Sequence, residues 1–184
     1  MKTRFTSFHE AYPPDANRKP YVPARHDRYA AVVPPEIVEE WRAFGFGSYG
    51  GGLLWTPLPD EPFLAPREWR TLDGTGVEIL RTAFADFIIW QGGTFRWLNT
   101  HSGRTLEYSP NPDLLFDSMT EKPFRRAVLF EPMFHRAKER LGDLALDETF
   151  GFAPLPALGG AMEDEYVVKV KLREYLVLAA QVRS

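Results

Sequence analysis

One stretch of the chain, residues 77–108, constrains the fold more than any other. It contains runs of apolar, partly β-branched residues, and its later runs alternate apolar with polar side chains. Gly92–Gly93 and Ser102–Gly103 interrupt these runs at positions where short turns would reverse the chain. Since a short turn joins only antiparallel neighbours, the stretch predicts an antiparallel meander of three or four strands.

A helix is expected just before this sheet. Residues 34–44 begin with two prolines, which suit a first helical turn, and Ile37, Trp41 and Phe44 recur at the spacing of one helical face. Gly45 is then a typical helix stop.

Further helices are expected beyond the meander. Residues 121–131 stay ambiguous, because Pro132 prevents one unbroken helix there. The other expected elements are a helix through about Met119, a helix from Pro132 to Gly142, a buried irregular segment over 150–160, a strand over 166–170 and a helix over 172–182. The predicted class is α+β, a central antiparallel β-meander flanked by N-terminal and C-terminal helices.

The segment from Gly45 to Trp55 imitates a nucleotide-binding motif. Gly45, Gly47 and Gly50 satisfy G-x-G-x-x-G, which requires a strand before the glycines and a helix after them. Here the expected helix precedes the glycines, and Leu53 begins an expected strand. The segment therefore indicates a helix stop and a turn, and a small-molecule enzyme that uses this loop is kept as an alternative.

Charge and composition exclude several classes of protein. The formal net charge of -3 and the pI near 5.8 do not favour a general nucleic-acid binder, and the chain has no cysteine for disulfides or thiolate chemistry. No apolar run is long enough to span a membrane, and the N-terminus lacks the apolar core of a signal peptide. We therefore expect a cytoplasmic protein.

Residues 1–33 form a proline-rich, mildly basic segment with six Lys or Arg and three Asp or Glu. A short helix is expected over 3–11, followed by an extended, solvated stretch along the surface. The same charge leaves open a DNA-binding autorepressor, in which this arm contacts promoter DNA.

Three stretches carry a resemblance when they are read in order. They are residues 41–55 with the glycine-rich turn, residues 86–90 followed by Asn99, and the region 141–176, which includes a Lys-Val-Lys-Leu-Arg-Glu run. Together they resemble the GAD-like domain proteins, whose characterised members are immunity proteins for DNase toxins of the bacterial type VI secretion system. The resemblance covers roughly residues 5–182.

The resemblance implies a division of the chain and a function. A basic arm over 1–33 would precede a GAD-like part over 34–108 and a mainly helical C-terminal part over 109–184, packed on the same core. The protein would be an antitoxin in bacterial competition: it would bind the nuclease domain of a cognate secreted effector as a heterodimer and occlude it. It would need no cofactor, no metal and no catalytic residue.

Two kinds of residue are candidates for the contact with such a partner. Nucleases carry basic DNA-binding clefts, so acidic loops would speed and orient binding. Aromatic side chains on an exposed turn would supply buried contact area. The candidates are Phe46 and Tyr49 in the glycine-rich turn, and Asp60, Glu61, Glu163, Asp164 and Glu165 on expected loops.

The remaining polar candidates receive structural interpretations. Asp147 and Glu148 stand beside an apolar run and are expected to cap a turn. His101 and His135 are expected on the surface, and the spacing of the histidines does not favour a metal site.

Overall fold

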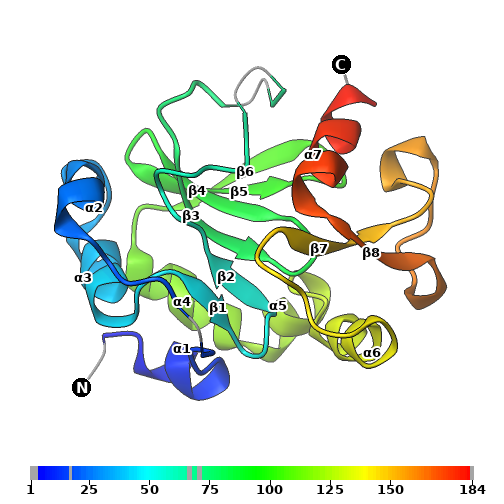
Figure 1. The fold of residues 1–184 in the computed structure, drawn as a ribbon, viewed down its shortest axis with the longest axis horizontal. Helices are drawn as coiled ribbons and strands as arrows, with labels where there is room; N and C mark the ends of the chain where they lie inside the picture. Colours follow the sequence, from blue (N-terminus) through cyan, green and yellow to red (C-terminus); the bar gives the residue numbers. More distant parts are fainter. Residues whose placement is uncertain (1–3, 17, 66–67, 70–71, 183–184) are drawn as a thin grey trace.

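A computed structural model describes residues 4–16, 18–65, 68–69 and 72–182. Its centre is a six-stranded antiparallel sheet in which each strand pairs with the next along the chain (Figure 1). The strands are β1 (Gly47–Tyr49), β2 (Leu54–Thr56), β3 (Val77–Thr82), β4 (Phe87–Gln91), β5 (Thr94–Asn99) and β6 (Arg104–Ser109). The expected meander is thus confirmed and is longer, because β1 and β2 extend it through the glycine-rich segment.

The other elements surround this sheet. None of the described helices is long and apolar enough to cross a membrane. They are α1 (Thr6–Ala11), α2 (Pro23–Ala30), α3 (Pro35–Phe44), α4 (Pro112–Thr120), α5 (Lys122–Ala127), α6 (Glu131–Leu141) and α7 (Leu172–Gln181), with two 3-10 turns, η1 (Pro156–Leu158) and η2 (Asp164–Tyr166), and a hairpin of β7 (Glu148–Phe152) and β8 (Val167–Lys171). The α+β class with flanking helices is confirmed.

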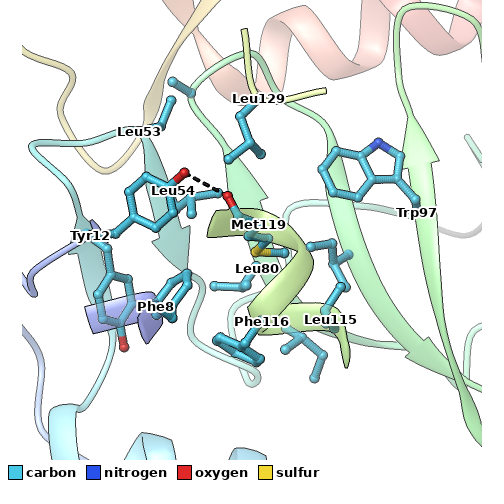
Figure 2. Close-up of a cluster of buried hydrophobic side chains, with 14 of the residues drawn as sticks. Phe8, Tyr12, Leu53, Leu54, Leu80, Trp97, Leu115, Phe116, Met119 and Leu129 are labelled. Carbon is cyan, nitrogen blue, oxygen red and sulfur yellow. Dashed lines mark hydrogen bonds between the residues drawn. The ribbon is translucent and has the colours of Figure 1, made fainter. Parts of the chain in front are cut away.

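The sheet lies between two apolar clusters. The larger cluster joins one sheet face to α1, α3, α4, α6 and β7, and part of it is drawn in Figure 2. The smaller cluster joins the other face to α7, which stands apart from α4, α5 and α6 in Figure 1. Consecutive residues of β4 alternate between the clusters, with Phe87 and Ile89 in the smaller one and Ile88 in the larger. This alternation follows from the period of two along a strand.

The N-terminal segment contributes several side chains to the core, so it is not a solvated arm throughout, although most of its described residues are exposed. Phe8 of α1 and Tyr12, which follows this helix, are almost fully buried, and the Tyr12 hydroxyl donates to the carbonyl of Met119 over 2.8 Å (Figure 2). The segment also runs beside β1 through the bridges Pro14 to Tyr49 and Lys19 to Phe46. Its apolar positions are too few to reveal this packing in the sequence.

Two further expectations need correction. The stretch after Pro20 is not extended throughout, because Pro23 occupies the first turn of α2, where its fixed φ favours a helix. The region 150–160 is not one buried irregular segment: its first three residues belong to β7, and Leu158 beyond it is 65% exposed. The ambiguous region 121–131 contains α5.

Candidate partner-binding surface

The backbone amides of the glycine-rich segment are occupied by a side chain of this chain. Asp15 accepts hydrogen bonds from the N–H groups of Gly51 and Gly52, at 2.9 and 3.0 Å. Arg18 binds the start of the same segment through its carbonyls: it donates hydrogen bonds to those of Phe44 and Gly45, at 2.6 and 3.0 Å. The carboxylate therefore takes the position that a phosphate would need, and α3 precedes the glycines as the sequence indicated.

Phe46 and Tyr49 are not exposed on a turn, so this part of the sequence prediction is wrong. Their exposed fractions are 2% and 1%. The ring of Phe46 packs against Trp41, and the Tyr49 hydroxyl donates to Glu40 over 2.8 Å. Burial, together with the neighbouring Glu40 charge, raises the pKa of Tyr49. The N-terminal segment covers both residues, and local sequence could not reveal that cover.

The acidic pair Asp60–Glu61 lies beside α2 and is largely neutralised. Asp60 accepts from Arg25 over 2.8 Å, and its side chain is only 9% exposed. Glu61 is 54% exposed and pairs with both Arg25, at 3.1 Å, and Lys19, at 3.8 Å. The positively charged side chains of the N-terminal segment thus form ion pairs with this loop and reduce its negative charge.

The second acidic group, Glu163 to Glu165, is exposed at η2. Asp164 pairs with Arg136 of α6 over 2.8 Å, while Arg140 donates to the carbonyl of the same residue. This group precedes β8 on the right of Figure 1, whereas α2 lies on the left. The structure therefore does not bring the two acidic groups together in one patch.

Asp147 and Glu148 are structural, as the sequence indicated. The Glu148 carboxylate accepts from the N–H of Ala145 over 3.0 Å, which closes the turn before β7. Asp147 pairs with Lys171 over 2.8 Å, across the β7–β8 hairpin.

His101 was expected on the surface and is instead buried. Its Nδ1 lies 3.2 Å from the Tyr175 hydroxyl, and its ring meets the edge of Phe152. The packing of α7 and β7 over the turn between β5 and β6 explains this burial. His135 is exposed, as expected. Within the described residues, no group of three or more His, Asp or Glu side chains could hold a metal ion.

A groove of about 460 Å³ lies between β6 and α5, and the sequence prediction missed it. Trp97, Leu106 and Tyr108 form its sheet side, while Phe124 and Val128 face them from the segment around α5. Trp97 and Phe124 meet edge to face, with ring centroids 5.5 Å apart. The alternation of Leu106 and Tyr108 marks one face of β6, but only the fold shows that α5 stops short of covering them.

One end of this groove is polar. It is formed by Asp86, Asn99, Ser102 and Arg104. Asp86 is buried and accepts from the backbone N–H of Thr100 over 2.8 Å, from Asn99 over 3.0 Å and more weakly from the Trp97 indole. Burial raises the pKa of Asp86 to about 7, although these donors act in the opposite direction. The groove thus offers an apolar wall, a hydrogen-bonded carboxylate and a guanidinium at its mouth.

Comparisons with known proteins give two family matches and a solved structure with a similar fold. Residues 3–102 match the model of the GAD-like domain, and residues 110–183 match the model of the C-terminal domain of the type VI secretion immunity protein Tdi1. A search of the curated proteins finds no match. Among solved structures, the crystal structure of Atu4351 from Agrobacterium tumefaciens shares the fold with a TM-score of 0.77 at 18% identity, over 96% of this chain and 88% of that one. The chain therefore belongs to the GAD-like domain family, as a type VI secretion immunity protein.

Proposed function

We propose that this chain binds the nuclease domain of a cognate type VI effector in the cytoplasm and keeps it from DNA. The observation that carries the proposal is the match of residues 110–183 to the immunity-protein family, because immunity implies an effector as the partner. The nuclease chemistry of that effector comes from the resemblance described above. Binding would form a heterodimer, and the inhibition would be steric.

The interior of the protein supports binding rather than turnover. The amides of the glycine-rich segment hold Asp15, and the aromatic side chains near it are buried in the core. These features make a small-molecule enzyme at this loop a poorer fit to the geometry than a protein that acts through its surface.

The N-terminal segment also fits a DNA-binding autorepressor poorly. A promoter-binding arm needs cations that are free to reach phosphates. Here Arg4 pairs with Asp113 over 2.7 Å, Arg25 pairs with Asp60, and Arg18 donates to backbone carbonyls. Most of the positive charge of the segment is therefore used to hold the fold together.

The direct test is co-expression with the nuclease domain encoded beside the gene for this chain. We expect the pair to co-purify at a one-to-one ratio, and the purified chain to suppress cleavage of plasmid DNA by that domain. A catalytically inactive nuclease variant should bind equally well, since occlusion needs no turnover. Undiminished toxicity together with failure to co-purify would refute the proposal.

A further inference from the structure

We propose that the outer edge of β6, together with the groove beside it, binds an extended segment of the effector that carries apolar and acidic side chains. This inference rests on the proposed function and adds to it the face of the molecule and the chemistry of the segment. Four observations carry it: the two sheet edges differ, β6 exposes apolar side chains, the groove adjoins them, and the nearby charge is positive.

The two edge strands of the sheet, β1 and β6, differ in what lies beside them. At β1, the N-terminal segment runs alongside the strand and bridges to Phe46 and Tyr49. At β6, no other strand of the described residues pairs with the outer side. An open edge offers backbone donors and acceptors to another chain, and natural proteins usually cover or shorten such edges. β6 spans Arg104–Ser109 and is among the longest strands of the sheet, so its open edge is a template for an added strand.

The side chains of this edge support the same conclusion. Leu106 is 62% exposed and Tyr108 is 36% exposed, and both point to the face that bears the groove. The other strands of the sheet bury nearly all their apolar side chains. An apolar side chain from an added strand could cross the face of β6 and enter the groove against Trp97 and Phe124. The groove is large enough for such a side chain.

Charge around the groove selects the partner. Arg104 lines the groove, whereas Lys122 and Arg126 lie on the exposed side of α5, away from the face that carries Phe124 and Val128. Arg104 forms no ion pair within the described part of the chain, whereas Arg125 of α5 is paired with Glu131 at 2.6 Å. The buried Asp86 carboxylate is already held by three donors. The exposed charge that lines the groove is therefore the guanidinium of Arg104, and an acidic residue in the bound segment complements it.

The acidic residue of the strand, Glu107, lies near Arg96 of β5 at 3.9 Å and alternates to the strand face opposite Leu106 and Tyr108, so it does not alter the charge on the groove side.

The experiment measures the affinity of the full chain for the neighbouring nuclease domain. Leu106→Asp, and separately Arg104→Glu, should each weaken binding by roughly 10- to 100-fold. Leu178→Asp on α7 and Arg28→Glu on α2 are matched controls on other exposed positions, and each should change the dissociation constant by less than about threefold. Circular dichroism melting of every variant tests whether its fold is intact.

Hydrogen exchange of the wild-type complex gives a readout without mutation. Backbone amides of Arg104–Ser109 should exchange more slowly when the nuclease domain is bound, as expected for an added strand. If the wild type binds but β6 gains no protection and the groove variants bind normally, this inference is wrong and the proposed function stands. If the wild type does not bind at all, both fail.

Discussion

At the scale of single residues, this protein uses charged side chains to hold backbone in place. Asp15 accepts hydrogen bonds from backbone N–H groups of the glycine-rich segment, and Arg18 donates hydrogen bonds to its backbone carbonyls. Gly51 and Gly52 adopt positive φ angles of 70° and 96° there. The sequence showed the glycines but not the carboxylate that fills their amides, because that carboxylate comes from a segment more than 30 residues away.

Asp15→Ala should destabilise the protein by about 1–3 kcal/mol, because two amides lose a charged acceptor and the N-terminal segment loses a tether. Urea unfolding followed by tryptophan fluorescence measures this loss. Asp117→Ala is the control, since Asp117 is exposed on α4, and it should change stability by less than about 0.5 kcal/mol. Equal stabilities of the two variants would contradict the role of Asp15.

The buried carboxyl group of Glu78 should make the free energy of unfolding depend on pH. Burial raises the pKa of Glu78 from 4.5 to about 7, although the N–H of Leu64, which donates to its carboxylate over 2.7 Å, partly offsets the shift. The folded state therefore holds this proton more tightly than the unfolded state does. The resulting stabilisation is complete below pH 4.5 and is lost as the pH rises through 7.

Glu78→Gln removes this titration and keeps an oxygen for the Leu64 amide. The stability of the variant relative to wild type should increase by about 3 kcal/mol between pH 4.5 and pH 7.5. Urea unfolding at both pH values measures the difference. Glu10→Gln, at an exposed position, should show no such change, and a pH-independent difference for Glu78→Gln would show that this carboxyl titrates normally.

At the scale of elements, the sequence revealed those that repeat a pattern and missed those that depend on distant partners. The β3–β6 meander and helices α3, α4, α6 and α7 follow from alternation, spacing and Gly or Pro boundaries. β1 is too short to carry a pattern, and α2 has only one buried residue, His26. The groove was missed because it results from where α5 ends relative to β6, which no local pattern records.

α1 tests how much a short helix contributes to the whole fold. Phe8 is fully buried and packs edge to face against Tyr12, Tyr49 and Phe116. Phe8→Ala should lower the free energy of unfolding by about 3–5 kcal/mol. Val32→Ala, at a position that is 54% exposed, should cost less than about 0.5 kcal/mol. A small loss of unfolding free energy for Phe8→Ala would mean that the packing of α1 contributes little to the stability of the fold.

At the scale of the whole molecule, the two family matches meet between residues 102 and 110, but the larger apolar cluster crosses that boundary. Phe84 before it packs on Phe150 and Phe152 after it, at centroid distances of 5.9 and 5.8 Å. We therefore expect one cooperative unfolding transition, with fluorescence and circular dichroism curves that coincide. Residues 110–184 expressed alone should remain unfolded, and two separated transitions would show two independent units.

The tether between Tyr12 and Met119 has a consequence for synthesis in the cell. The Tyr12 hydroxyl is synthesised 107 residues before the Met119 carbonyl to which it donates, so the bond cannot form until that later segment has left the ribosome. The sheet edge at β1 and the cluster beneath it are completed only when most of the polypeptide exists. A prematurely terminated product that ends before Met119 would lack this contact and would leave the cluster beneath β1 incomplete.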